Sequence, residues 1–172
     1  MKYVVVSDTH GDLGILEEIS AKFQGEVDAM LYCGDSELPA DAKIWENFQS
    51  VKGNCDYDMN YPNEKVLEFG SDRILLVHGH LHAVNFGLTS LSLLAREEQA
   101  NLVFFGHTHQ LGYEYQQGCL YLNPGSISYP RGQFTFIGGT FAIVETSDDE
   151  IKIDYYNREC ELVPNLSGVI QK

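Results

Sequence analysis

The segment Tyr3-Val4-Val5-Val6-Ser7-Asp8-Thr9-His10 joins a short apolar run to two metal-ligand side chains. Runs of about four to eight apolar residues, rich in valine and ended by polar turn residues, are typical of strands buried on both faces. We therefore predict a buried strand over residues 3–6, with Asp8 and His10 just beyond its carboxyl end.

The same arrangement recurs three times along the chain. The further apolar runs and the residues that follow them are Ala29–Tyr32 with Asp35, Ile74–Val77 with His78, and Leu102–Phe105 with His107 and His109. In open α/β sheets, the loops at the carboxyl ends of the strands converge on one edge. We expect these four loops to build one site, together with the cluster Gly53-Asn54-Cys55-Asp56.

Periodicity and turn signals place the remaining elements. We expect helices over 13–23, with Leu13, Leu16, Ile19 and Phe23 on one face, over 42–48 and over 88–99, and hairpins that pair 66–69 with 73–77, 113–115 with 119–122, and 140–145 with 151–156. A parallel start and an antiparallel finish favour an α/β fold in which two sheets pack face to face with helices outside.

Composition restricts the classes of function. The 172 residues are predicted to form a single domain over 1–172, and 11 Lys and Arg against 25 Asp and Glu give a net charge of −14. That charge argues against long nucleic acid as a partner. No apolar stretch approaches the roughly 20 residues that span a bilayer. The four cysteines lack a C-x-x-C spacing and no signal peptide precedes them, so we expect a cytoplasmic protein without a membrane partner.

Imidazole and carboxylate ligands together suit a divalent transition metal such as manganese, iron, zinc or nickel. The sequence offers more candidates than one ion needs, and two metal ions are the economical interpretation. The seven candidate ligands are Asp8, His10, Asp35, Asn54, His78, His107 and His109.

The order of these clusters resembles the pattern D-x-H, G-D, G-N-x-D, H-G and G-H-x-H of the calcineurin-like metallophosphoesterases. It is most similar to their small bacterial and archaeal phosphodiesterase branch, which also contains the retromer subunit fold. The five blocks begin at Asp8, Gly34, Gly53, His78 and Gly106, and Asn123-Pro124-Gly125-Ser126 with Arg131 resembles the downstream segment of the family. The resemblance implies a four-layer α/β/β/α sandwich of two mixed sheets.

The resemblance also implies which residue binds which ion. Asp8, His10 and His109 would hold one metal, Asn54, His78 and His107 the other, and Asp35 would bridge the two. A hydroxide between the ions would attack phosphorus in line, while Asn54 and His78 also help to hold the phosphate. The expected activity is that of a manganese-dependent phosphodiesterase, with nickel, iron or zinc as alternatives, acting on small or nucleotide-like esters.

Several neighbouring residues have open roles. Many family members carry histidine where this chain has Cys55, which we interpret as a small buried side chain, so the leaving-group proton is expected from water, His80 or His82. Asp56 would orient a ligand histidine or cap the following loop. Arg131, Tyr57 and Tyr61 are either substrate contacts or ordinary surface and packing residues.

Three other functions stay open at this stage. A phosphomonoesterase would use the same metal pair, a protein-binding scaffold would keep the fold without the chemistry, and a metal sensor or store would bind ions without turnover. The expected partner is a small-molecule phosphate ester. Apolar residues near the first helix are compatible with a homodimer or a higher homo-oligomer.

Overall fold

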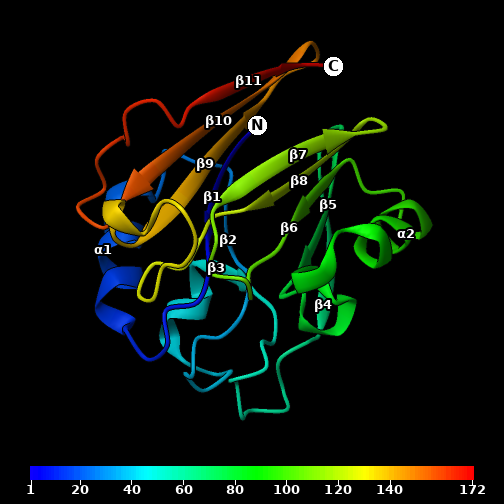
Figure 1. Cartoon of the computed structure of the whole chain (residues 1–172). Coiled ribbons are helices and arrows are strands. Elements are labelled where there is room, and N and C mark those ends of the chain that lie inside the picture. Colours follow the sequence, from blue (N-terminus) through cyan, green and yellow to red (C-terminus); the bar gives the residue numbers. More distant parts are fainter.

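The computed structural model describes residues 1–172 and has four layers: a helix, two sheets and a second helix. Figure 1 shows α1 (Leu13–Phe23) on one side, α2 (Thr89–Glu97) on the other, and both sheets between them. Both sheets are mixed, which confirms the predicted α/β/β/α sandwich. None of the helices is long and apolar enough to cross a membrane.

The first sheet contains six strands in the order β11-β10-β9-β1-β2-β3. Strands β1, β2 and β3 are parallel to one another, β9 is antiparallel to β1, and β10 and β11 continue the sheet in antiparallel pairs. The strands are β1 (Lys2–Val6), β2 (Ala29–Tyr32), β3 (Phe48–Ser50), β9 (Thr140–Thr146), β10 (Glu150–Asn157) and β11 (Gly168–Gln171).

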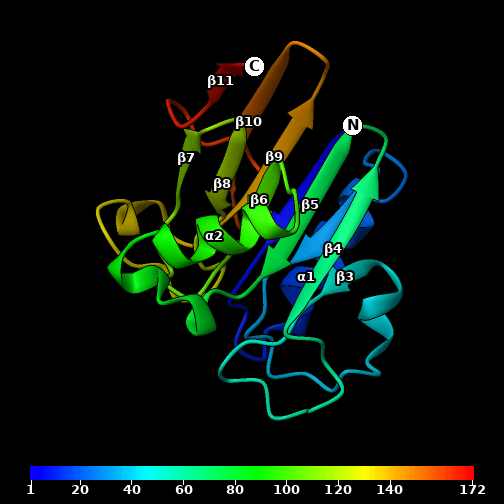
Figure 2. The same ribbon diagram turned by 90° about the vertical axis from the view of Figure 1, so that its right-hand side faces the viewer.

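The second sheet contains five strands in the order β4-β5-β6-β8-β7. Its three inner strands are parallel, whereas β4 and β7 are antiparallel edges. The strands are β4 (Glu64–Phe69), β5 (Asp72–Val77), β6 (Leu102–Phe104), β7 (Gly112–Gln116) and β8 (Cys119–Asn123). Figure 2 shows α2 lying across the outer face of this sheet.

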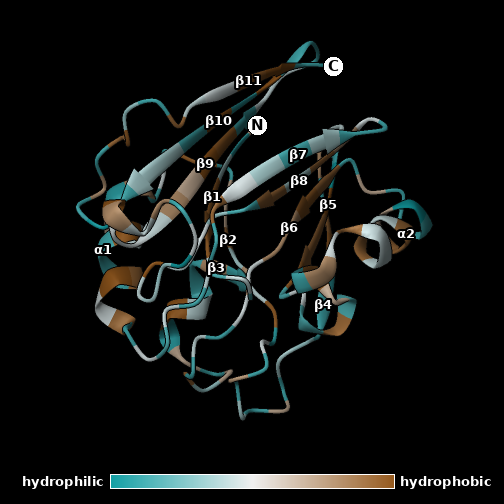
Figure 3. Ribbon diagram, in the orientation of Figure 1, coloured by the Kyte–Doolittle hydropathy of each residue, from teal (hydrophilic) through white to brown (hydrophobic).

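Three apolar clusters fill the three spaces between the layers. One, including Val5, Leu76 and Leu122, lies between the sheets. A second packs α1 on the first sheet through residues such as Leu16, and a third packs α2 on the second sheet through residues such as Leu91. The inner strands carry these side chains on both faces, and Figure 3 shows β5, β6, β8 and β9 as largely hydrophobic, with β7 paler.

The structure corrects three details of the prediction. The helix expected over 42–48 is a 3-10 turn at Lys43–Glu46 followed by β3, because Phe48 pairs with Met30 of β2 and extends the sheet. Strand β11 was not expected. Leu13 lies at the exposed start of α1, while Ile15 takes the buried position.

Candidate metal centre

The predicted ligands lie together where the strands of both sheets end. Asp8 follows β1, Asp35 follows β2, Asn54 follows β3, His78 follows β5, and His107 and His109 follow β6. Figure 1 shows these loops gathered on the side of the molecule away from the two termini. The expectation that separate loops meet at one edge is confirmed for the whole set.

Two glycines allow this close approach. A Cβ atom at Gly106 would lie 2.0 Å from Ser7 Oγ, so only glycine lets the second sheet's loop reach the first sheet here. A Cβ atom at Gly53 would lie 2.0 Å from Asp35 Oδ1. Both contacts fall far inside van der Waals distance, and larger side chains would push the ligand loops apart.

The first group of ligand atoms comes from Asp8, His10 and His109. Their ligand atoms all lie within 4.8 Å of one another. His109 Nε2 is 3.2 Å from Asp8 Oδ1 and 3.3 Å from His10 Nε2. Asp8 is fully buried, and its Oδ1 atom has no hydrogen-bond partner.

The second group surrounds His78. Its Nε2 atom is 3.3 Å from Asp35 Oδ2 and 3.1 Å from Asn54 Oδ1. Asp35, His78 and Asp8 also form a group within 4.8 Å, and Asp35 belongs to another such group with His10 and Cys55. Asp35 therefore reaches the surroundings of both His10 and His78.

His107 lies beside the second group but belongs to none of these compact groups. Its ring centre is 5.1 Å from that of His78, and its Nε2 atom accepts a hydrogen bond of 2.9 Å from Asn85 Nδ2. His80 packs against the same pair, with its ring centre 5.3 Å from that of His78. His80 thus lies beside the candidate ligands His78 and His107.

The outer nitrogen of three histidines is held by an acceptor. His78 Nδ1 donates to Cys33 O and His109 Nδ1 donates to Tyr129 O, both at 2.7 Å, because a carbonyl oxygen can only accept. His10 Nδ1 donates to Glu37 Oε1 at 2.7 Å. These bonds fix the ring orientation and turn each Nε2 atom towards the carboxylates.

This arrangement fits a divalent cation. A neutral imidazole with its proton on Nδ1 carries a lone pair on Nε2. His10 Nε2 and His109 Nε2 thus face each other and the unpartnered Asp8 Oδ1, and three acceptors cannot satisfy one another. A positive charge among them, either a shared proton or a metal ion, removes the conflict.

The electrostatics of the site favour positive charge. Burial alone would raise the pKa of Asp35, but the hydrogen bond and charge of His78 outweigh it and hold this pKa well below its usual range. Burial lowers the pKa of His78 and of His109, yet the carboxylates Asp35 and Asp8 raise both above the ordinary value. Burial and the neighbouring His78 lower the pKa of His80 and of His107.

The ligand loops have unusual backbone conformations. Left-handed φ values are uncommon outside glycine and cluster at functional sites, where surrounding contacts must hold them. Five of the seven predicted ligands adopt them: Asp8 (58°), His10 (47°), Asp35 (59°), His107 (68°) and His109 (60°). Asp8 N donates to Gly34 O and His10 N to Asp35 O, each at 3.1 Å, so the first two ligand loops brace each other.

Asp56 supports the loop that carries Asp35. Its two carboxylate oxygens accept hydrogen bonds from the backbone N–H groups of Asp35, Ser36, Glu37 and Gly53 at 2.7–2.9 Å, and from the Ser36 hydroxyl at 3.0 Å. It forms no hydrogen bond to a histidine and holds a loop that precedes it, so both expected roles, orienting a ligand histidine and capping the following loop, are wrong. The loop that it caps precedes it by about 20 positions in the sequence.

The other open residues now have defined places. Cys55 is half-buried and lies beside Asp35 and His10, which corrects its interpretation as a buried apolar side chain, and burial and the Asp35 charge raise its pKa to about 11. Tyr61 is buried and donates to Leu38 O and Pro39 O, so it is a packing residue. Tyr57 and Arg131 are exposed, and His82 is half-buried.

Two residues whose side chains form hydrogen bonds with ligand histidines were not foreseen. Glu37 pairs with His10, and Asn85 reaches His107 across 22 positions of sequence. Glu37 carried a weak signal because it is a carboxylate two residues after Asp35. Asn85 carried none.

Comparison with known proteins gives a consistent result. The model of the calcineurin-like phosphoesterase superfamily domain matches residues 1–149. The probable metallophosphoesterase YsnB of Bacillus subtilis is 37% identical over 168 residues, which cover 98% of either chain.

Solved structures show the same relationship. A conserved uncharacterized protein, described as a predicted phosphoesterase, from Streptococcus pneumoniae has a TM-score of 0.96 and 40% identity over 99% of this chain and 97% of its own. A single mutant of Vps29 from Entamoeba histolytica shares the fold alone, with a TM-score of 0.73 and 20% identity over 100% of this chain and 99% of its own. With all five sequence blocks gathered in one site and this match over most of its length, the chain belongs to the calcineurin-like phosphoesterase superfamily.

Proposed function

We propose that this protein is a dinuclear-metal phosphodiesterase that acts on small or nucleotide-like phosphodiesters, with manganese as the first metal to test. The observation that supports this proposal most directly is the orientation of His78, His109 and His10. Their Nδ1 atoms donate to Cys33 O, Tyr129 O and Glu37 Oε1, so that their Nε2 atoms point towards Asp8 and Asp35. Family membership supports a phosphoester as the substrate class.

Each ion would take its ligands from one side of the site. Asp8, His10 and His109 would hold one ion, and Asn54, His78 and His107 would hold the other. Asp35 would serve both ions, since its carboxylate lies within ligand reach of His10 in one group and of His78 in another. His107 would exchange its hydrogen bond with Asn85 for the metal.

Two bound divalent ions would supply an activated water at neutral pH and positive charge for the phosphate oxygens. The chain supplies position and polarity around them. Asn54 is exposed at the edge of the site, where its amide can donate to a phosphate oxygen beside His78. Fixed donors and charges of this kind usually carry much of the rate enhancement.

Cys55 lies beside Asp35 and His10, and a neutral thiol is a weak proton donor to an expelled alkoxide. Leaving-group protonation then falls to water, His80 or His82. Substrates whose leaving group needs little protonation, such as aryl esters, are favoured. Equal rates on alkyl and aryl diesters would contradict this part of the proposal.

The test is hydrolysis of bis-p-nitrophenyl phosphate by metal-stripped protein, with and without added manganese, beside p-nitrophenyl phosphate. Asp35→Asn should abolish turnover, whereas Asp148→Asn, an equivalent change in an exposed turn, should leave it unchanged. Turnover of the monoester alone would indicate a phosphomonoesterase. Stoichiometric metal binding without turnover of either ester would overturn the enzymatic proposal in favour of a scaffold or a metal-binding role.

A further inference from the structure

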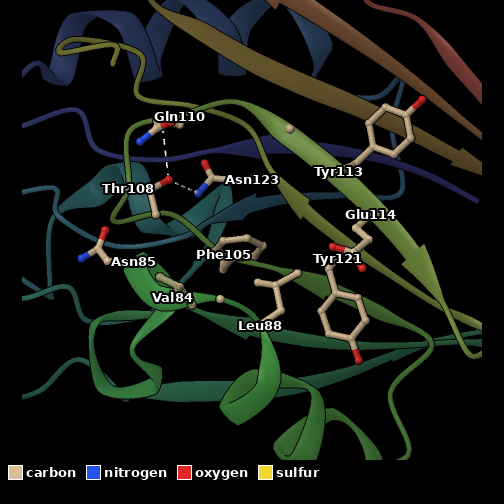
Figure 4. Close-up of a pocket in the computed structure, with 12 residues that line it drawn as sticks. Val84, Asn85, Leu88, Phe105, Thr108, Gln110, Tyr113, Glu114, Tyr121 and Asn123 are labelled. Carbon is tan, nitrogen blue, oxygen red and sulfur yellow. Dashed lines mark hydrogen bonds between the residues drawn. The ribbon is translucent and has the colours of Figure 1, made fainter. Parts of the chain in front are cut away.

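A cavity of about 360 Å³ lies on the outer face of the second sheet, directly beside the candidate metal centre. Figure 4 shows Val84, Leu88 and Phe105 gathered at its middle. Tyr121 and Glu114 lie at one end, and the polar side chains of Asn85 and Thr108 at the other. Its size falls in the range of about 300–1,000 Å³ that is usual for ligand pockets.

The polar end of this cavity is shared with the metal centre. Asn85 lines the cavity, and its Nδ2 atom is 2.9 Å from His107 Nε2. Thr108, which also lines it, stands between the candidate ligands His107 and His109 in the chain. A group attached to a phosphate at the metal centre is thus separated from the cavity by the width of one amide side chain.

The lining indicates what would fill the space. Phe105 and Tyr121 are almost fully buried, and with Val84 and Leu88 they give the cavity an apolar wall. Glu114 is exposed at the far end and forms no ion pair, so it disfavours a second anionic group there. An uncharged, flat, apolar group gains most from such a surface, because burial of carbon area is the dominant favourable term.

We infer that this cavity binds one ester group of the substrate and selects an uncharged aromatic ester over a small aliphatic or an anionic one. This inference rests on the proposed function, because it takes the phosphate to lie at the metal centre. It adds a specificity-determining site to the metal ligands themselves. This site is made of residues that follow β5 and β6 and of residues within β7 and β8.

Gly112 allows the cavity to be filled selectively. It lines the cavity, its φ angle is not in the left-handed region, and a Cβ atom placed on it would meet no atom within 4 Å. The series Gly112→Ala, Gly112→Val and Gly112→Leu therefore narrows the space step by step without strain. Gln116→Leu is the matched control, since alternate residues of a strand share a face, so Gln116 lies on the same side of β7 as Gly112 but outside the cavity.

The experiment compares the affinity of phenylphosphonate and methylphosphonate for the manganese-loaded protein by calorimetry. The two probes share one phosphonate group, so the ratio of their affinities isolates the organic group. We expect phenylphosphonate to bind about tenfold more tightly or better, from the area of one buried ring. The affinity ratio should fall towards one across the Gly112 series, while the affinity for methylphosphonate stays unchanged. In the Gln116→Leu variant, both affinities should equal those of the parent protein.

Equal affinities in the parent protein, or a preference that persists in Gly112→Leu, would overturn the inference. The alanine variant keeps the test informative if the leucine variant fails to fold. Turnover of bis-p-nitrophenyl phosphate, measured on the same preparations, separates this failure from failure of the proposed function. Intact turnover without a preference for phenylphosphonate would refute the aromatic-ester inference alone. Loss of turnover together with no binding of either phosphonate would refute both this inference and the proposed function.

Discussion

Replacement of Asp56 by asparagine should destabilise the loop that carries Asp35, although Asp56 itself binds no metal. The Asp56 side chain is 4% exposed. Its Oδ1 atom accepts three hydrogen bonds, from Ser36 N, Ser36 Oγ and Glu37 N, and its Oδ2 atom accepts two, from Asp35 N and Gly53 N. An asparagine presents an NH₂ group in place of one oxygen, so at least two donors lose their acceptor in either orientation of the amide.

Hydrogen bonds to a charged acceptor contribute roughly 1.5–3 kcal/mol each, so the loss of two should lower the free energy of unfolding by about 3–6 kcal/mol. That is a large share of the roughly 5–15 kcal/mol typical of a domain. Urea denaturation of the metal-free protein measures it. Manganese affinity should fall as well, because the same loop positions Asp35 and Glu37.

Asp58→Asn is the matched control. Asp58 also accepts backbone N–H groups, from Ala40 and Asn60 at 2.9 Å, but it lies in an open loop where water can replace the lost acceptor. Its urea midpoint should stay close to that of the parent protein. A loss below about 1 kcal/mol in Asp56→Asn, or an equal shift in both variants, would refute the reasoning.

Three further outcomes follow from single contacts. Glu37→Ala removes the acceptor of His10 Nδ1, so manganese affinity should fall about 10–100-fold by calorimetry, and an unchanged affinity would count against its orienting role. Tyr3→Phe removes the 2.7 Å hydrogen bond to buried Asp72 and should cost about 1–3 kcal/mol in urea denaturation, unlike Tyr57→Phe at the surface. The hydrogen bond from Arg158 lowers the pKa of Asp12, so this half-exposed pair stabilises the fold, by less than about 1 kcal/mol, above the unfolded pKa near 3.9. The stability difference between the parent protein and Asp12→Asn should therefore shrink as the pH falls from 6 to 3, and a constant difference would exclude this linkage.

The strands that sequence predicts best are those buried on both faces. The residues Tyr3, Val4, Val5 and Val6 have no exposed surface, so every position had to be apolar and the run was visible. Strands β3 and β11 lack that signal, because each is a short strand at an edge of the first sheet and only part of it is covered. The apolar pattern in the sequence therefore reports burial on both faces of a strand, rather than strand formation itself.

In the candidate site, the sequence likewise predicts some features and not others. Carboxylates and imidazoles after apolar runs predicted which side chains would meet, because strand ends at one sheet edge are neighbours. Their orientation could not be predicted, since two of the three acceptors that hold the histidines are backbone oxygens of Cys33 and Tyr129, which any residue type provides. Asp56 was misjudged because spacing does not reveal whether a carboxylate meets a ring nitrogen or a backbone amide.

The position of the ligands explains why the two sheets must stay in register for the site to exist. Asp8 and Asp35 extend from the first sheet, while His78, His107 and His109 extend from the second, so neither sheet alone supplies a complete set. The two halves are joined at the site itself, where His107 N donates to Asp8 Oδ2 and Gly106 packs against Ser7. Like-charged carboxylates and converging lone pairs would push this junction apart, and a bound cation would draw it together. Metal binding and packing of the sheets are therefore one linked equilibrium, in which a ligand that binds only the folded state adds its binding free energy to stability.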